Sequence, residues 1–349
     1  MKRPRPVVRR APAAPGRARL LELIDAFRNR RLLVLADLVA DEFITGRGQR
    51  LSREAPVLIL DYQGTEVRLG GGANAVHNIR ALGGRPLPLG VLGRDEPGRR
   101  LRALLRSAGV STRGVFSDPS YATPVKARIL AGGAHAAKQQ IVRIDRVAPL
   151  PPDSPARPAL LRVLKEHAQP VDGVLVSDYG LELITPRLVE AAVGLARKRK
   201  VPVTVDSRNA LLSFKGMTAV TPNEPEVEAA LGLAIGDDRV RLEAAGRRLL
   251  RRLGVQAVLI TRGSDGMALF EPGRPAFHVP IFGSDQVSDV TGAGDTVIAT
   301  FTLALAAGAT PAEAALLANY AGGIVVMKRG TATVSAAELR AAVQSDLGG

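Results

Sequence analysis

A chain of 349 residues with 46% hydrophobic and 23% charged residues has the composition of a globular protein that can bury a sizeable core. It contains no cysteine, which excludes disulfide bonds, cysteine-based zinc sites and thiol catalysis, and its four scattered histidines offer no paired spacing for a metal. No apolar run approaches the roughly 18 residues of a membrane-spanning helix, and no secretion signal is visible, so we expect a cytoplasmic protein without a membrane partner.

The net charge of +15 is concentrated near the N-terminus, where residues 1–31 hold ten basic and two acidic side chains. Residues 1–18 are rich in proline, alanine and arginine and show no apolar period, which predicts a disordered arm without a role in the chemistry. The alternative is an electrostatic tether to RNA or to an acidic surface. Only 3% of the residues are aromatic, so bases would find little to stack on, and we expect no specific nucleic-acid partner.

Short apolar runs alternate with amphipathic segments along most of the chain. The apolar runs predict strands at Arg31–Ala36, Leu87–Leu92, Gly173–Ser177, Val201–Val205, Met217–Val220 and Ala257–Ile260. Helical spacing is found at Ala73–Leu82, Gly98–Ala108, Pro186–Arg199, Glu224–Leu231 and Val240–Leu253. This alternation predicts an α/β fold with a parallel sheet covered on both faces.

Two segments, Phe43–Leu69 and Tyr121–Asp145, interrupt that alternation. Both contain strand-like runs separated by turn residues, with no helix between them. They predict a small antiparallel sheet that projects from the main domain.

The strongest motif is Asp289-Val290-Thr291-Gly292-Ala293-Gly294-Asp295-Thr296, which is followed by an apolar helix predicted at Val297–Ala306. A glycine-rich turn that opens a helix presents free backbone N–H groups to an anion such as a phosphoryl group. Gly292 and Gly294 let the backbone approach that group closely. Asp295 lies beside it, where a carboxylate can accept a proton from an attacking hydroxyl. The alternative is a plain strand–turn–helix junction in which Asp295 is an N-cap.

The motif resembles the C-terminal signature of the ribokinase-like (PfkB) carbohydrate kinases. Gly70-Gly71-Gly72-Ala73-Asn74, with Leu82-Gly83-Gly84 after the helix, resembles the N-terminal signature of that family, and the resemblance extends from about Leu32 to Leu339. It implies a ribokinase-like three-layer α/β sandwich over residues 19–349 with a mostly parallel sheet and a small β-sheet lid. It also implies an ATP-dependent kinase with Asp295 as its base and Gly292, Ala293 and Gly294 around the phosphate. Neither a P-loop nor a dinucleotide-binding motif is present.

The same resemblance assigns the substrate-binding residues. Asp37 and Asp41, in the family's DxxxD pattern, would bind substrate hydroxyls, together with Gly70, Gly71 and Asn74. Acidic residues at the carboxyl end of a strand also lie where α/β sheets bind ligands, independently of any resemblance. The alternative for either aspartate is a helix cap or a turn residue.

Further segments resemble the nucleotide and metal sites of the family. Asn223 and Glu226, in an NxxE pattern, would organise Mg²⁺ through its waters; the alternative is an acid-rich helix start. The remaining implied contacts are Thr261, Gly263 and Gly266 with the nucleotide phosphates and ribose, Asn319 near the adenine, and Asp289 with Thr291 at a monovalent cation such as K⁺. Asn319 lies on a helix opened by the capping box Thr310-Pro311-Ala312-Glu313, and a solvent-facing asparagine is the alternative there.

Within the family, four segments are similar to the branch that phosphorylates the anomeric hydroxyl of D-glycero-D-manno-heptose 7-phosphate. They are Leu51–Val57, Lys138–Asp145, Ser177–Tyr179 and Lys328–Ser335. This similarity implies substrate contacts from Gln140, Arg143 and Asp178. The cations Arg53, Lys126, Arg128, Lys138, Arg143 and Arg208 are candidates for binding the substrate phosphate.

Two departures from that branch keep other substrates open. Leu181-Glu182 replaces a Lys-Gly pair, and Asp206-Ser207-Arg208 replaces Asp-Pro-Lys. The alternatives are a kinase for another sugar or nucleoside, or a catalytically silent sugar-binding protein. Lids of this family often pair between subunits, which implies a homodimer.

Overall fold

The computed structural model describes residues 16–132, 138–167, 169–283 and 289–346. Its main sheet consists of β1 (Arg31–Ala36), β4 (Arg85–Gly93), β5 (Val115–Asp118), β8 (Gly173–Asp178), β9 (Val203–Ser207), β10 (Ala219–Val220), β11 (Ala257–Thr261), β12 (Met267–Phe270) and β13 (Phe277–Val279). The strand order is β13-β12-β11-β10-β9-β8-β1-β4-β5, and only β12 and β13 run antiparallel to their neighbours. This is the mostly parallel sheet predicted from the sequence.

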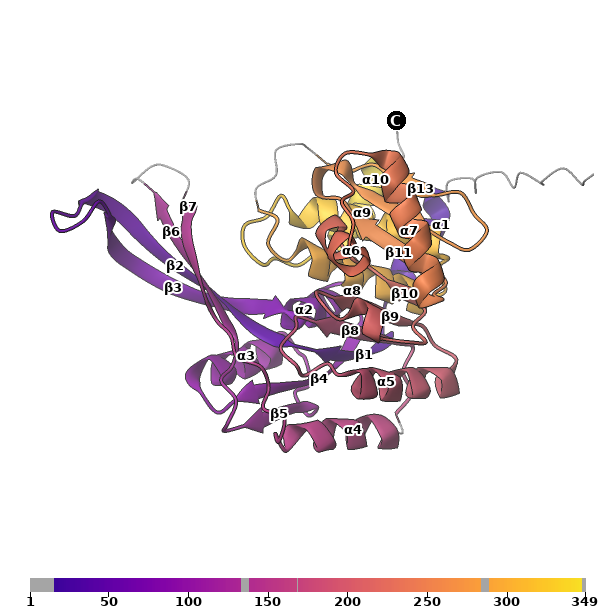
Figure 1. The fold of residues 1–349 in the computed structure, drawn as a ribbon, viewed down its shortest axis with the longest axis horizontal. Coiled ribbons are helices and arrows are strands. Elements are labelled where there is room, and N and C mark those ends of the chain that lie inside the picture. The colour runs from indigo at the N-terminus through magenta and orange to yellow at the C-terminus, as the bar shows by residue number, and fades with distance from the viewer. Residues whose placement is uncertain (1–15, 133–137, 168, 284–288, 347–349) are drawn as a thin grey trace, which may run out of the picture.

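Helices cover both faces of the sheet and make a three-layer sandwich (Figure 1). They are α1 (Arg17–Ala26), α2 (Gly72–Ala81), α3 (Glu96–Ser107), α4 (Ala156–Glu166), α5 (Pro186–Arg199), α6 (Glu224–Leu231), α7 (Arg239–Leu253), α8 (Ala293–Ala306), α9 (Pro311–Val325) and α10 (Ala336–Asp346). One core lies under α1–α3 and α8–α10, and the other under α4–α7. In β1, Leu32 and Val34 face the first core while Leu33 and Leu35 face the second, because successive strand residues point to opposite faces.

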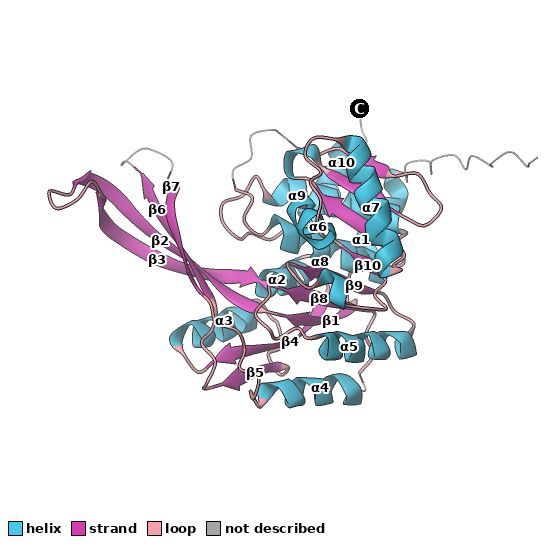
Figure 2. Ribbon diagram, viewed as in Figure 1, coloured by secondary structure: helices cyan, strands magenta, loops and turns pink. Residues whose placement is uncertain are grey.

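A second sheet projects from this body as the lid (Figure 2). It contains β2 (Leu38–Leu51), β3 (Leu58–Gly71), β6 (Val125–Gly132) and β7 (Gln139–Arg146), in the order β3-β2-β6-β7. The prediction of an antiparallel lid is right within each hairpin and wrong between them, since β2 and β6 pair in parallel. β2 and β6 are the first strands of the two hairpins, and both run outward from the main domain. Where the hairpins lie side by side, these two strands are neighbours and are therefore parallel.

The two faces of the lid differ in chemistry. Asp41 and Phe43 of β2, Lys126 and Arg128 of β6 and their cross-strand partners lie on the face toward the main domain, which we call the inner face. The opposite, outer face carries Ile44, Val67, Ile129, Val142 and Ile144, with one ion pair between Glu42 and Arg146 near the base of the lid. The polar inner face is therefore the one available for a substrate.

The N-terminal boundary lies close to the predicted one. Helix α1 starts at Arg17, and Arg19 hydrogen-bonds to Glu313 near the start of α9, so the last two residues of the predicted arm are helical. The prediction for residues 1–15 lies outside the described residues. None of the helices within the described ranges is long and apolar enough to cross a membrane.

Candidate active site

The carboxylate of Asp295 lies in the first turn of α8, at the carboxyl end of the parallel strands. Helix α8 begins at Ala293, four residues before the predicted start, so Gly294 and Asp295 are helical residues. Asp295 is only 3% exposed, and its oxygens accept hydrogen bonds from the Tyr179 hydroxyl (2.8 Å) and the Asn74 amide (3.1 Å). Burial raises the pKa of Asp295 to about 7, against the lowering effect of these two bonds. A carboxylate with this pKa is suited to exchange protons near neutrality.

Asn74 connects the two glycine-rich signatures. Its amide also donates to the Gly292 carbonyl (3.2 Å), and its own oxygen accepts from Asn78 (3.1 Å) one turn further along α2. Asn78 in turn accepts the backbone N–H of Val334. This buried chain of amides holds α2, α8 and the C-terminal loop in fixed positions around the carboxylate.

Gly292 and Gly294 have different reasons to be glycine. Gly292 is the N-cap of α8 with φ of 79°, and a Cβ there would overlap the amide nitrogen of Asn74. Gly294 has helical geometry, and a Cβ on it would meet no atom within 4 Å. The N–H groups of Gly294 and Asp295 belong to the first helical turn, where no preceding helical carbonyl can accept them. Gly294 thus leaves open space and a free N–H donor, as an anion site requires.

Asp37 lies on the other side of Tyr179, directly after β1. One oxygen accepts the backbone N–H of Tyr179 (2.8 Å), while the other is buried with no hydrogen-bond partner in the described structure. Burial, the largest cause, raises the pKa of Asp37 to about 7. A buried carboxylate oxygen without a partner is costly, and a substrate hydroxyl would satisfy it.

Asp41 is the second predicted substrate ligand, on the inner face of the lid. It forms a buried ion pair with Arg128 across the β2–β6 ladder (2.7 Å). A Cβ on Gly70 of β3 would lie 2.5 Å from the Asp41 carboxylate, and Gly71 next to it has φ of 52°. Gly70 and Gly71 therefore make room for this carboxylate and for the start of α2 rather than offering side-chain chemistry of their own.

Two cations lie over the ring of Tyr179. The Lys126 ammonium is 4.5 Å and the Arg208 guanidinium carbon 5.0 Å from the ring centroid. Burial and the charge of Arg208 lower the pKa of Lys126, while Asp41 and Asp295 oppose that change. Positive charge is thus gathered beside the carboxylate that would receive a proton.

A group of acidic residues faces these cations at the ends of β9 and β10. Asn223 and Glu226 form a reciprocal capping box at the start of α6, with Asn223 accepting the Glu226 N–H at 2.8 Å and Glu226 accepting the Asn223 N–H at 2.9 Å. Burial and the charge of Glu226 raise the pKa of Asp206 well above its usual range, and burial also raises the pKa of Glu226. Mutually repelling, desolvated carboxylates suit a nearby cation. Within the described ranges, however, no cluster of three or more His, Cys, Asp or Glu is placed to hold a metal directly.

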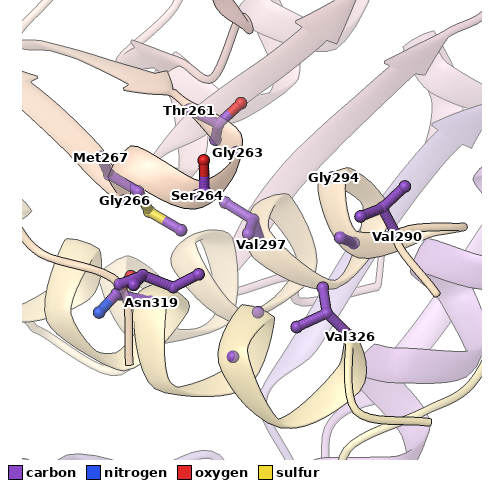
Figure 3. Close-up of a pocket in the computed structure, with 14 residues that line it drawn as sticks. Thr261, Gly263, Ser264, Gly266, Met267, Val290, Gly294, Val297, Asn319 and Val326 are labelled. Carbon is purple, nitrogen blue, oxygen red and sulfur yellow. The ribbon is translucent and has the colours of Figure 1, made fainter. Parts of the chain in front are cut away.

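A mostly apolar pocket opens on the other side of Gly294 (Figure 3). It is lined by Thr261, Gly263, Ser264, Gly266, Met267, Ile281, Val290, Ala293, Gly294, Val297, Asn319, Gly322, Gly323 and Val326. All four residues predicted to contact the nucleotide base, ribose and phosphates line it. Asn319 is buried, with its amide nitrogen donating to the Pro280 carbonyl (2.8 Å), so the solvent-facing alternative is wrong.

A second cavity lies between the inner face of the lid and the loops of the main domain. Its lining consists of Phe43, Thr45, Glu66, Arg68, Arg128, Leu130, Lys138, Gln139, Gln140, Asp289, Arg329 and Gly330. Gln140, a predicted substrate contact, is part of this lining. Arg143 is not part of this lining and pairs with Asp145 on the exposed strand β7 (2.9 Å). Asp295 follows Ala293 and Gly294, which line the apolar pocket. The lid cavity is lined by Arg128, the ion-pair partner of Asp41.

Two other predicted site residues use their carboxylates within the protein. Asp178 accepts from Gly180 N–H (2.9 Å) and Ser207 hydroxyl (2.6 Å), which fixes the turn that carries Tyr179. Asp289 accepts the N–H groups of Thr291 (2.9 Å) and Gly330 (2.9 Å). Burial alone would raise the pKa of Asp289, but these hydrogen bonds hold it below its usual range. Both aspartates therefore shape the loops beside Asp295.

Several site residues were missed by the sequence reasoning. Tyr179 was noted only as part of a motif, and the hydroxyl bond to Asp295 joins residues 116 positions apart. Arg68 in the lid cavity carried no signal, because a single arginine in a chain this basic is unremarkable, and Arg329 was noted only within the segment Lys328–Ser335. The period-2 alternation of β3 would place Arg68 on the same face as Glu66, and is the one signal that could have found it.

This arrangement, an α/β sandwich with a lid and a buried carboxylate at the glycine-rich start of a helix, defines a phosphotransferase. The model of the pfkB family carbohydrate kinases matches residues 44–338. The chain belongs to the pfkB family of carbohydrate kinases. The N-cap of α8 is Gly292, so the alternative in which Asp295 is the N-cap is wrong.

The chain is similar to bifunctional HldE proteins. It is 44% identical to that of Geobacter metallireducens over 313 residues, 89% of this chain and 62% of the relative, and 38% identical to that of Caulobacter vibrioides over 330 residues, 94% and 66% respectively. The chain therefore spans about three fifths of the length of the first of these relatives.

Solved structures agree on the fold. Arabidopsis thaliana ribokinase complexed with ribose and ATP superposes with a TM-score of 0.67 at 22% identity, covering 92% of this chain and 99% of that one. Phosphofructokinase-2 from Escherichia coli in complex with potassium gives 0.71 at 18% identity, covering 91% and 99%. The predicted ribokinase-like architecture is confirmed.

Proposed function

We propose that the protein transfers the γ-phosphoryl group of ATP to the anomeric hydroxyl of D-glycero-D-manno-heptose 7-phosphate, with Asp295 as general base. The observation that carries the proposal is the place of Asp295, buried at the start of α8 beside the free N–H of Gly294. A hydroxyl brought against this carboxylate would lose its proton as it attacks phosphorus, while the helix N-terminus faces the charge on the phosphoryl oxygens.

The apolar pocket behind Gly294 supports a nucleotide as the phosphoryl donor. A base and ribose in the pocket lined by Thr261, Gly266 and Asn319 would direct their phosphates toward the free N–H groups of α8. The pocket and the carboxylate share one helix turn, so donor and acceptor would meet at its N-terminus.

Asn223 and Glu226 would organise Mg²⁺ through its water shell, beside the desolvated Asp206. Mg²⁺ would supply neutralisation of the phosphate charge, and it commonly keeps several waters, which suits two residues already joined in a capping box. Asp289 and Thr291 would serve a monovalent cation near the same loop. The pKa of the Asp289 carboxylate is held below its usual range, so it is ionised at neutral pH and offers the negative charge that a cation requires.

The lid cavity supports a sugar that already carries a phosphate. Arg68, Arg128, Lys138 and Arg329 line it, against Glu66 and Asp289. Lys138 and Arg329 have no carboxylate within ion-pair distance in the parts of the chain that are described. Together with the four segments similar to the heptose branch and the similarity to HldE proteins, these cations favour a phosphosugar over a neutral sugar or a nucleoside.

The outer face of the lid supports a homodimer. Val142 and Ile144 are 44% and 50% exposed, and Ile44, Val67 and Ile129 lie next to them on the same face. In a symmetric dimer the same face of a second lid would pack against these side chains and remove them from water.

A product assay tests the proposed reaction. The protein is incubated with MgATP and a panel of heptose 7-phosphate, free heptose, ribose, fructose and adenosine, and the product is identified by NMR. We expect kcat/KM for heptose 7-phosphate to be at least about 10³-fold higher than kcat/KM for any unphosphorylated acceptor. An acceptor without a phosphate would leave the cations of the lid cavity unpaired. An equal or better value for a neutral acceptor would reject the heptose phosphate and leave the kinase assignment standing.

A further inference from the structure

Tyr179 touches both of the buried carboxylates at the centre of the site. Its backbone N–H donates to Asp37 and its hydroxyl donates to Asp295, each at 2.8 Å. The hydroxyl hydrogen bond ends on Oδ1 of Asp295, whereas Asn74 occupies Oδ2. One residue therefore fixes the rotation of the Asp295 carboxylate relative to the group that would hold the substrate.

The environment of the ring strengthens this donor. Lys126 of β6 and Arg208 after β9 lie 4.5 Å and 5.0 Å from the ring centroid. Within the described ranges neither cation has a carboxylate within ion-pair distance, so their charge acts on the ring and on its hydroxyl. Positive charge beside a phenol makes its hydroxyl a stronger hydrogen-bond donor, here to the ionised carboxylate of Asp295.

We propose that Tyr179 is a positioning residue for the phosphoryl transfer, which aims the Asp295 carboxylate and keeps it ionised, with Lys126 and Arg208 reinforcing its hydrogen bond. The inference rests on the proposed role of Asp295 as the base. Tyr179 then acts through its hydroxyl as well as through the packing of its ring.

The charges around Asp295 act in opposite directions. Asp41 on β2 and Asp206 on β9 repel its negative charge, and Lys126 on β6 attracts it. The hydrogen bonds from Tyr179 and Asn74 lower the pKa of Asp295 against the effect of burial. Burial and Asp295 itself raise the pKa of Tyr179 well above its usual range, so the phenol stays a donor at every pH of an assay. Removing the hydroxyl therefore removes stabilisation of the ionised form only.

The test is the pH dependence of turnover in Tyr179→Phe, measured with heptose 7-phosphate and MgATP from about pH 5.5 to 9.5. Loss of a hydrogen bond to a charged group should shift the acid limb of kcat upward by about one to two pH units. Turnover at pH 7 should fall about 5- to 50-fold, since Asp295 is half ionised there in wild type, and should recover to within about threefold of wild type at the alkaline end. A tyrosine that serves only packing would lower turnover equally at all pH values, and that result would overturn the inference.

Tyr320→Phe is the matched control. Its hydroxyl also donates to a carboxylate, that of Asp346 at 2.6 Å, but on the helices α9 and α10. The acid limb of this variant should coincide with that of wild type. A shift as large as that of Tyr179→Phe would mean that any lost phenol–carboxylate bond perturbs the enzyme, and would reject a specific role for Tyr179.

Two further measurements cover the cases in which the first variant is uninformative. If Tyr179→Phe does not fold, Arg208→Met must shift the acid limb upward by a smaller amount, and an unshifted limb overturns the inference. The difference between the pH dependence of unfolding of a variant and that of wild type reports the change at Asp295 without any substrate, because Asp37, which also titrates near 7, is present in both. This difference should show the Asp295 titration moving upward in either variant. Asp295→Asn separates the two proposals: an active Asp295→Asn enzyme rejects the base itself, whereas an inactive one combined with an unshifted Tyr179→Phe profile rejects only the role of Tyr179.

Discussion

Asn74 and Asp295 share a hydrogen bond of 3.1 Å that joins the N-terminal glycine signature to the C-terminal one across 221 residues. The same amide group holds the Gly292 carbonyl, so the carboxylate and the turn before it are positioned by one side chain. The two signatures are therefore parts of one site, and a change in either should be felt at Asp295.

Replacing Asp295 by asparagine should reduce kcat by about 10² to 10⁴, the usual effect of losing a general base. The change is almost isosteric, and Asn can keep one of the two hydrogen bonds, so the Kd for ATP should stay within about threefold of wild type. Steady-state kinetics and calorimetric titration of ATP measure the two quantities. A variant that keeps turnover within about tenfold would remove Asp295 from the role of base.

Activity should decline as the pH falls below about 7, because Asp295 must be ionised to accept a proton and its pKa is raised to about 7. Each pH unit below that value should cost about tenfold in kcat. The measurement is kcat at saturating substrates between about pH 5 and 9. A flat profile across this range would contradict the raised pKa of the base.

The same pKa predicts how stability changes with pH. An unfolded Asp295 would titrate near 3.8 and the folded one near 7, so between these values the folded state holds a proton that the unfolded state has released. The contribution of Asp295 to the free energy of unfolding is therefore most favourable below about pH 4, and this contribution is lost as the pH rises toward 7. Asp295→Asn should therefore raise Tm at pH 8, by an amount equivalent to at least about 1 kcal/mol, and should change it little at pH 4. Equal Tm values at pH 8 would contradict a penalty for burying this charge.

Alanine at Gly292 and at Gly294 should have opposite consequences for stability. Gly292→Ala would strain a φ of 79° and displace Asn74, so both Tm and kcat should fall. Gly294→Ala adds a methyl group to open space in a helix, so Tm should be unchanged or higher, while KM for ATP rises because the methyl enters the apolar pocket. Thermal unfolding and ATP titrations distinguish the two. Similar losses of Tm in both variants would contradict the difference between the two glycines.

The helices of the main domain and the position of Asp295 at the start of one of them follow from local patterns. The helices predicted at Pro186–Arg199 and Glu224–Leu231 are those observed, because apolar periodicity and caps lie within a few residues of each other. The same holds for the capping box at Thr310. Residues at the ends of parallel strands converge on one edge, so the motif positions could be assembled without coordinates.

What the sequence could not provide are pairings between distant side chains. The β-strands at the far edge, β12 and β13, are three or four residues long, too short for a clear alternation. The partners of Asp41 and Asp295 lie 87 and 116 residues away, and no local period encodes them. The backbone conformation of Gly294 could not be predicted either. The sequence does not distinguish a glycine with helical geometry from one in the left-handed region, and only the structure shows that Gly294 is helical.

The cations of the lid cavity should control the affinity for a phosphosugar and not for ATP. Lys138→Met and Arg329→Met each remove an unpaired charge from its lining, so KM for heptose 7-phosphate should rise about 10- to 100-fold with KM for ATP unchanged. Arg50→Met, at an exposed position farther out along β2, is the matched control and should leave both values unchanged. Equal KM values for the sugar phosphate in all three variants would place its phosphate elsewhere.

The outer face of the lid should control the oligomeric state. A group of exposed apolar side chains on one sheet face favours association with an equal surface, so we expect the protein to be a dimer at micromolar concentration. Val142→Glu places a charge among Ile44, Ile129 and Ile144 and should shift the protein to monomer, seen by analytical ultracentrifugation. Val240→Glu is the matched control, because Val240 is 78% exposed but lies on α7, on the main domain, and this variant should stay dimeric. A monomeric wild type, or equal dissociation of both variants, would show that the lid face does not pair.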